Sequence, residues 1–198
     1  MLLTLAMVLV SSEGAGPSTA IGYQDFPLQK GDRICQIGNA LAERMQHDGY
    51  LETLLQNRFP AHELVVRNLG FSGDELVHRS RSQDFGSPDD WLSHWKASVV
   101  FAFFGFNESF AGEEGLESFR KDLDRFIDHT VGQQYNGRSP ARLVIFSPIA
   151  FENLGNPNLP DGARHNGRLE RYTRAMAEVA GAKGVRFVDL YHASRGIY

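Results

Sequence analysis

One segment of the sequence is apolar along its whole length, and it limits the folds that the chain can adopt. Residues Ser98–Phe104 read SVVFAFF, a run rich in β-branched and aromatic residues. Such a run is typical of a strand buried on both faces, because a strand with one solvent-facing side alternates polar and apolar residues. A strand covered on both faces needs a layer above its sheet and a layer below it. The run therefore favours an α/β architecture.

The segments around this run alternate between strand-like and helix-like patterns. Four further short apolar segments predict strands, at 33–37, 64–67, 142–147 and 185–189. Apolar residues at steps of three and four predict helices over 40–58, 113–131 and 163–183. Strands that are separated by helical crossovers form a parallel sheet. We therefore expect a three-layer α/β/α domain around a parallel sheet of five strands.

Composition excludes several classes of protein. A chain of 198 residues supports one hydrophobic core, and a net charge of -4 gives no basic footprint for nucleic acid. The single cysteine, Cys35, excludes a disulfide framework within the chain and a zinc ribbon. The seven histidines show no metal-ligand spacing, so we predict neither a metal nor a cofactor. No apolar run reaches the roughly 18 residues that a membrane span needs.

The N-terminus differs from the rest of the chain. Leu2–Val10 is short and apolar, and small polar residues follow in Ser11–Ala15. This order is typical of a secretory signal peptide, although the usual cationic start is missing. The alternative is an added strand or helix at the edge of the fold. We predict a signal peptide or anchor over 1–15, a linker over 16–29, a domain over 30–198, and a periplasmic or secreted location.

The turns after the predicted strands carry the candidate site, because ligands of parallel sheets bind at the carboxyl ends of the strands. Three of these turns pair glycine with small polar side chains: Gly38–Ala40, Asn68–Asp74 and Gly105–Glu108. Glycine lets a backbone N–H approach a ligand closely, and an amide side chain can donate to an oxyanion. Ordinary turn chemistry explains any one of these turns taken alone.

Taken in order, the three turns resemble the sequence blocks of the SGNH (GDSL) hydrolase family. The first block, Gly-Asp-Ser with a serine nucleophile, matches the stretch that ends in Gly38–Ala40. The second block places an oxyanion-hole glycine at Gly73. The third block, Gly-x-Asn-Asp, falls on Gly105–Glu108 and makes Asn107 the second oxyanion donor. The resemblance runs from about Lys30 to the end of the chain.

The resemblance implies a flavodoxin-like α/β/α fold and hydrolysis of carboxylic esters of carbohydrates, lipids or small acylated molecules. Within this family, the chain resembles the SGNH-type domain of large secreted bacterial multidomain proteins. A small-molecule ester or a glycan is therefore the expected ligand, and a larger multidomain protein is the expected context. Nucleic acid is not expected.

The nucleophile position is the first departure from the family pattern. Ala40 stands where the family has serine, and a methyl group cannot attack a carbonyl. Ser72 does not fit the G-x-S-x-G nucleophile pattern, and Ser109 lies on the third turn. Loss of a catalytic serine typically costs about 10⁶-fold in turnover. We therefore expect a weak or inactive site, with Ala40 as the vacant nucleophile position.

The acid–base block is the second departure. The family places Asp-x-x-His at the head of a final helix, and Asp189-Leu190-Tyr191-His192 has this spacing. Asp189 is predicted to end the last strand, however, and only six residues follow His192. In one interpretation Asp189 orients His192 as a general base. In the other the match arises by chance, in a chain that is truncated before the true block and lacks the C-terminal helix.

Three hypotheses for function remain open. The first is an SGNH-type hydrolase with an altered nucleophile, and the second is a non-catalytic module that binds a carbohydrate or an acyl group. The third is an interaction domain of a larger secreted assembly. Trp91 and Trp95 either cover the sheet or line a groove. The segment Asn153–Arg164 is predicted to be a surface loop over the end of the fourth strand, where loops that select a substrate would lie.

Overall fold

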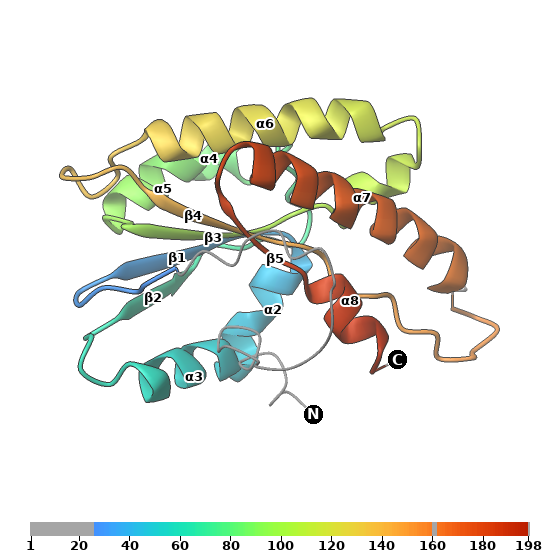
Figure 1. Cartoon of the computed structure of the whole chain (residues 1–198), viewed down its shortest axis with the longest axis horizontal. Coiled ribbons are helices and arrows are strands. Elements are labelled where there is room, and N and C mark those ends of the chain that lie inside the picture. Colours follow the sequence, from blue (N-terminus) through green and yellow to red (C-terminus); the bar gives the residue numbers. More distant parts are fainter. Residues whose placement is uncertain (1–25, 160–161, 198) are drawn as a thin grey trace.

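Five parallel strands form the centre of the protein. The structure, a computed structural model, describes residues 26–159 and 162–197. The strands are β1 (Arg33–Gly38), β2 (Val65–Asn68), β3 (Val99–Phe103), β4 (Arg142–Phe146) and β5 (Arg186–Val188). They pair side by side in the order β2-β1-β3-β4-β5, and every pairing is parallel (Figure 1). The predicted α/β fold with a five-stranded parallel sheet is confirmed.

Helices cover both faces of this sheet. The longest are α6 (Leu116–Gly132) and α7 (Gly162–Ala182), which lie on one face together with α4 (Ser82–Phe85) and α5 (Pro88–His94) (Figure 1). The other face carries α2 (Ala40–Asp48), α3 (Tyr50–Arg58) and α8 (Leu190–Arg195). A 3-10 turn, η1 (Glu108–Ala111), follows β3. None of the helices in the described ranges is long and apolar enough to cross a membrane.

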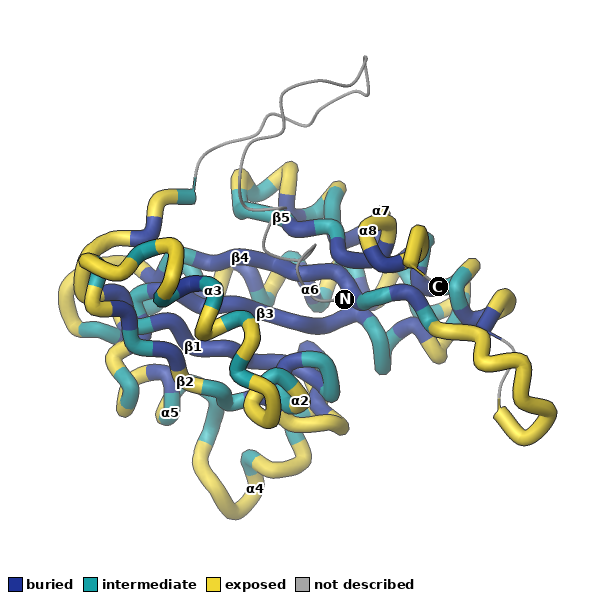
Figure 2. Tube along the Cα trace, turned by 90° about the horizontal axis from the view of Figure 1, so that it is seen from below, coloured by how far each residue is buried: buried dark blue, intermediate teal, exposed yellow. Residues whose placement is uncertain are grey.

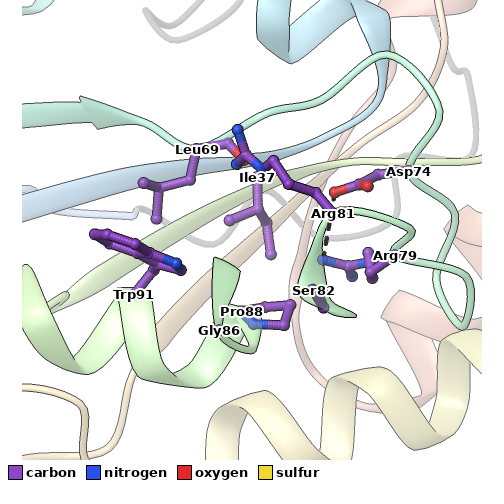
Figure 3. Close-up of a pocket in the computed structure, with 9 residues that line it drawn as sticks. All are labelled: Ile37, Leu69, Asp74, Arg79, Arg81, Ser82, Gly86, Pro88 and Trp91. Carbon is purple, nitrogen blue, oxygen red and sulfur yellow. Dashed lines mark hydrogen bonds and ion pairs between the residues drawn. The ribbon is translucent and has the colours of Figure 1, made fainter. Parts of the chain in front are cut away.

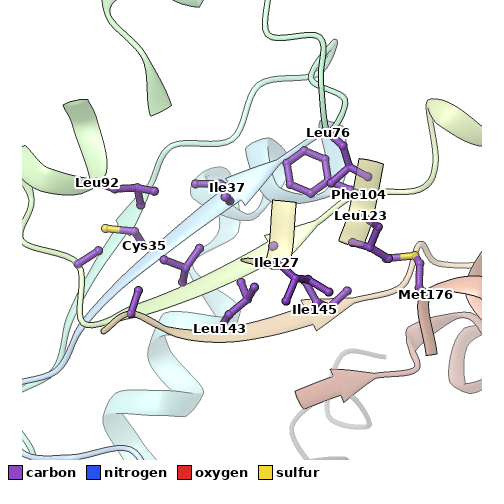
Figure 4. Packing of buried hydrophobic residues seen from close by; sticks show 14 of the residues in the cluster. Cys35, Ile37, Leu76, Leu92, Phe104, Leu123, Ile127, Leu143, Ile145 and Met176 are labelled. Atoms are coloured by element: carbon purple, nitrogen blue, oxygen red, sulfur yellow. The ribbon is translucent and has the colours of Figure 1, made fainter. Parts of the chain in front are cut away.

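Side chains of β3 alternate between two buried clusters, one on each face. Val100 and Ala102 belong to the α6-side cluster, which also contains Leu123 and Ile127 of α6 (Figure 4). Val99, Phe101 and Phe103 belong to the α2-side cluster, which also contains Ala42, Leu55, Val144, Phe146 and Leu190. The strands are the most buried part of the trace, and the helices and loops around them carry the exposed residues (Figure 2). The apolar run from 98 to 104 thus fills both cores, as its composition predicts.

The helix predicted over 40–58 is two helices in the structure. Gly49 lies in the left-handed region with φ of 63°, and its N–H donates to the carbonyl of Met45. This geometry ends α2, and α3 begins at the next residue. Glycine adopts positive φ at little cost, so it ends helices readily. The prediction of one continuous helix was wrong because the apolar spacing continues through the break.

A second difference lies after β5. The strand ends at Val188, and Asp189 is the N-cap of α8, whose side chain accepts a hydrogen bond from the N–H of His192. The expectation that the chain lacks a C-terminal helix considered only the six residues after His192. The helix α8 starts before His192 and spans six residues, Leu190–Arg195.

Residues 26–29 contact the body of the domain. Leu28 is buried in the α2-side cluster, and Phe26 packs against it. The predicted signal peptide or anchor (1–15) and most of the predicted linker (16–29) lie outside the described residues.

Candidate active site

The turn between β1 and α2 places Ala40 at the carboxyl end of the sheet. Gly38 has φ of 126°, and a Cβ there would lie 2.0 Å from the carbonyl oxygen of Phe103. Asn39 is buried and caps α2, because its Oδ1 accepts from the N–H of Leu41 at 3.3 Å. Ala40 is the first residue of α2 and is half-buried rather than part of a core cluster. The predicted sharp strand-to-helix turn is present, with a methyl group where the family pattern has a hydroxyl.

The turn after β2 lies against this first turn. The N–H of Phe71 donates to the carbonyl of Gly38 at 2.8 Å. Gly70 packs so closely on α2 that a Cβ would lie 2.6 Å from the backbone nitrogen of Glu43. A hydrogen bond of 2.9 Å from the N–H of Asp74 to the carbonyl of Phe71 closes the turn and leaves Gly73 exposed at its tip.

Asn107 joins the third turn to the second. Its Nδ2 donates to the carbonyl of Ser72 at 3.1 Å and to the carbonyl of Asp74 at 3.1 Å. These two carbonyls flank Gly73, so the structure brings Asn107 and Gly73 together as predicted. A carboxamide has two N–H hydrogens, and here both are directed at backbone carbonyls. Asn107 therefore clamps the turn, and its role as an oxyanion donor stays a prediction.

Two backbone donors remain available near this clamp. The N–H groups of Ala40 and Gly73 donate no hydrogen bond to any acceptor in the ranges 26–159 and 162–197. Ala40 also lies at the N-terminus of α2, where unpaired N–H groups and the helix dipole favour a negative or partly negative oxygen. These two groups are therefore free to donate to a ligand carbonyl, in addition to the predicted donor Asn107.

Glu108 is a structural residue rather than a base. Its Oε1 accepts from the N–H of Leu76 at 2.9 Å, and its Oε2 accepts from the N–H of Gly105 at 2.8 Å. Burial raises the pKa of the Glu108 carboxyl, although these backbone hydrogen bonds oppose the rise. Both carboxylate oxygens are thus used to hold the second and third turns together.

Neither nearby serine is positioned as a substitute nucleophile. Ser109 is fully buried, and its Oγ donates to the carbonyl of Phe106 at 2.6 Å. Ser72 is exposed, and its Oγ donates to the carboxylate of Glu43 on α2. A serine nucleophile needs a general base with an oriented partner, and no histidine is in hydrogen-bond contact with either serine among the described residues.

Asp189 and His192 form a hydrogen-bonded pair. Nδ1 of His192 lies 2.6 Å from Oδ2 of Asp189, and Oδ1 of Asp189 accepts from the N–H of His192 at 2.9 Å. The side chain of His192 is 56% exposed and that of Asp189 is 38% exposed. Leu190, which lies between them in the sequence, belongs to the same buried cluster as Ala42 of α2. The pair has the contact that an oriented base needs. It also has the geometry of an ordinary helix N-cap, so its catalytic role stays a prediction.

The described residues contain no group of three or more His, Cys, Asp and Glu side chains that could hold a metal ion. The clamp made by Asn107 had no signal in the sequence, because a Gly-x-Asn pattern does not reveal which groups the amide hydrogens contact. The helix cap at Asp189 did have a signal, since aspartate is a preferred N-cap residue.

The sequence was compared with models of known protein families. A model of the GDSL-like lipase/acylhydrolase family matches residues 19–197. The chain belongs to this family. The match spans all five strands, the three turns and the Asp189–His192 pair. A search of curated protein sequences found no match.

Solved structures similar to this GDSL-family chain include several esterases. One is a catalytic mutant of Axe2, an acetylxylan esterase from Geobacillus stearothermophilus, with a TM-score of 0.64 and 16% identity over 86% of this chain and 81% of that one. Another is LAE5, an α/β hydrolase from the metagenome of Lake Arreo, with a TM-score of 0.61 and 20% identity over 86% and 82%.

A third is BT4096, a gut microbial diltiazem-metabolizing enzyme, with a TM-score of 0.64 and 18% identity. The alignment covers 86% of this chain but 39% of BT4096, so the chain spans well under half the length of that protein. At these identities the three structures establish the shared fold.

Proposed function

We propose that this GDSL-family domain binds a carboxylic ester of a carbohydrate, a lipid or a small acylated molecule, and hydrolyses it weakly or not at all. The observation that carries the proposal is Ala40 at the first residue of α2, directly after β1. A methyl group there cannot form the covalent acyl intermediate that a serine forms. Removal of a catalytic serine typically lowers turnover by about 10⁶-fold.

The part of the site that would hold an ester carbonyl is better preserved than the nucleophile. The unpaired N–H groups of Ala40 and Gly73 face no competing acceptor in the described ranges. Backbone N–H groups at a helix N-terminus stabilise a carbonyl oxygen without a serine. The similarity of the fold to an acetylxylan esterase supports an acylated carbohydrate as the first ligand to test.

The alternative is a non-catalytic carbohydrate- or acyl-binding module of a larger secreted protein. The greater length of BT4096, of which this chain covers 39%, supports a multidomain context. In this alternative the Asp189–His192 pair only caps α8. Glycan binding without turnover distinguishes it from a weak hydrolase.

The first experiment measures hydrolysis by the full chain. We expect no serine-dependent turnover of p-nitrophenyl acetate and no labelling by a fluorophosphonate, which needs an activated hydroxyl. Ala40→Ser restores the hydroxyl, and Ala40→Gly changes the same position without adding one. We expect Ala40→Ser to stay within about tenfold of Ala40→Gly, because a restored hydroxyl has no oriented general base if the Asp189–His192 pair only caps α8.

Robust hydrolysis by Ala40→Ser that disappears when His192→Ala is added would show an intact acid–base pair and would contradict the interpretation of Asp189–His192 as a helix cap alone. A different result would contradict the proposal of a weak or inactive site. Wild-type turnover that survives Ser72→Ala and Ser109→Ala would require attack by an activated water.

The second experiment measures binding of acetylated xylo-oligosaccharides by calorimetry. Saturable binding without product release supports the binding module. The absence of both binding and turnover would refute an ester-binding site.

A further inference from the structure

A pocket lies beneath α4 and α5, beside the turn that carries Gly73. Its empty space, counted together with the open solvent at its mouth, is about 380 Å³. Its walls come from the ends of β1 and β2, the segment 74–81 and the two short helices (Figure 3). The residues that line it are Ile37, Leu69, Asp74, Arg79, Arg81, Ser82, Gly86, Pro88 and Trp91.

Asp74 is the unusual residue of this pocket. Its side chain is 9% exposed, and Oδ1 has no hydrogen-bond partner. The other carboxylate oxygen, Oδ2, lies 4.0 Å from Nη1 of Arg79, which is too far for a hydrogen bond. Burial raises the pKa of this carboxyl. A buried acceptor without a donor destabilises the protein, so a ligand that donates a hydrogen bond to Oδ1 removes this cost.

Arg79 supplies a donor beside this acceptor. Its Nε donates to the carbonyl of Glu75 at 2.6 Å, and its guanidinium stacks over the ring of Phe104 at 4.6 Å. These contacts fix the guanidinium plane, and its Nη atoms donate no hydrogen bond within the described ranges. Figure 3 shows the carboxylate of Asp74 and the guanidinium of Arg79 facing each other at one wall of the pocket.

The charge of the pocket restricts the ligand further. Arg81 also lines the pocket, so two guanidinium groups surround one carboxylate. This surplus of positive charge disfavours an ammonium ligand. A simple anion brings no donor for the unpaired Oδ1 of Asp74, so it does not complete the site. The opposite wall is apolar and includes Leu69, Pro88 and Trp91. A neutral molecule with one polar edge and one apolar face fits this arrangement.

We propose that this pocket binds a vicinal diol of a monosaccharide or related polyol. One hydroxyl donates to Oδ1 of Asp74, and the adjacent hydroxyl accepts from Nη of Arg79. The carbon face of the ring packs on Trp91, which its hydrogen bond to the carbonyl of Phe85 holds in place at 2.6 Å. Each hydroxyl of a sugar ring both donates and accepts, so two adjacent hydroxyls can pair with the acceptor of Asp74 and the donor of Arg79, which face each other.

This binding site goes beyond the proposed ester site and does not depend on it. The two are linked, however, because the carbonyl of Asp74 accepts the hydrogen bond from Asn107. A diol in the pocket would therefore hold the turn of Gly73 from its other side.

Titration of the full chain with small ligands tests the proposal. The readout is the indole N–H resonance of Trp91, assigned by comparison with Trp95→Phe. The probes are cis-1,2-cyclohexanediol and D-xylose, with cyclohexanol as the analogue that carries one hydroxyl. We expect saturable shifts with the two diols and affinity at least about tenfold weaker for cyclohexanol, because one charge-assisted hydrogen bond is lost.

A matched pair of variants tests the role of the carboxylate. Asp74→Asn keeps the shape of the side chain and removes its charge, and Asp84→Asn makes the same change at an exposed position on α4. We expect about tenfold weaker diol binding for Asp74→Asn and no change for Asp84→Asn.

Three outcomes would overturn the diol site. The first is an unmoved Trp91 resonance in the wild-type protein at about 0.1 M diol, a concentration far above a Kd of about 1 mM. The second is equal affinity for diol and cyclohexanol. The third is an unchanged diol affinity in a folded Asp74→Asn variant. The ligand comparison uses the wild-type protein, so it holds even if Asp74→Asn does not fold. None of these readouts involves hydrolysis. Failure of the diol proposal therefore does not affect the ester-site proposal, and failure of the ester-site proposal does not affect the diol proposal.

Discussion

The Asn107→Ala variant tests whether the side chain of Asn107 stabilises the fold by clamping the turn around Gly73 or serves only as an oxyanion donor. The clamp consists of two hydrogen bonds of 3.1 Å from Nδ2 to the carbonyls of Ser72 and Asp74. A net contribution of about 0.5–1.5 kcal/mol for each bond predicts that Asn107→Ala lowers the free energy of unfolding by about 1–3 kcal/mol. A side chain held in place only to contact a substrate would contribute little to stability.

Urea unfolding measures this effect, with Asn57→Ala as the control, because Asn57 is exposed on α3. We expect the control to stay within about 0.5 kcal/mol of the wild-type protein. Hydrogen exchange gives a second readout, since loss of the clamp should speed exchange at the N–H of Asp74 more than at residues of α6. An unchanged midpoint and unchanged exchange in Asn107→Ala would refute the clamp.

Three further predictions concern the framework of the site. Gly38→Ala should lower the free energy of unfolding by at least about 3 kcal/mol, because its Cβ would meet a backbone oxygen at 2.0 Å. Gly49 also has positive φ, but no atom lies within 4 Å of the Cβ that alanine would add, so Gly49→Ala should cost only about 1–2 kcal/mol. Equal costs for the two variants in urea unfolding would contradict the predicted collision between the new Cβ at position 38 and the backbone of β3. Burial raises the pKa of the Cys35 thiol to about 12, so iodoacetamide at about pH 8.5 should alkylate the unfolded chain at least ~10³-fold faster than the folded one. The raised pKa also implies that the free energy of unfolding decreases as the pH increases above about 8.5, because the thiol of the unfolded chain releases its proton first. An equal decrease with pH in a Cys35→Ala variant would contradict this explanation. Asp32→Ala should cost about 3 kcal/mol, because it removes the buried carboxylate that pairs with Arg142 of β4 and accepts a hydrogen bond from Ser98. Glu117→Ala, whose ion pair is exposed, should change stability by less than about 0.5 kcal/mol in the same assay.

The strand pattern could be predicted from the sequence because burial on both faces leaves a direct signature. Every second residue of β3 enters the same cluster, and neither cluster admits a polar side chain from this strand. The pattern of residues 98–104 therefore determines both the strand and the two helical layers. Helix boundaries carry a weaker signature, because apolar spacing can continue through a break. At Gly49 only the backbone conformation separates α2 from α3.

The positions of the site residues could be predicted, but their hydrogen-bond partners could not. The order of strands and turns places Ala40, Gly73 and Asn107 at one end of the sheet. The direction of the amide of Asn107 depends on two carbonyls more than thirty residues away in the sequence. The unpaired oxygen of Asp74 depends likewise on the position of Arg79, which the sequence does not specify.

The framework residues and the nucleophile position differ in what the fold requires of them. A side chain at Gly38 would collide with β3, and loss of Glu108 would leave the N–H groups of Leu76 and Gly105 without an acceptor. Ala40, in contrast, is half-buried at the start of a helix, where alanine is a good helix former and no neighbouring group needs a hydroxyl. Replacement of a serine by alanine at such a position would remove a hydroxyl without weakening the fold. With Ala40 at the proposed nucleophile position, the protein can keep the turns around it and any binding that these turns support.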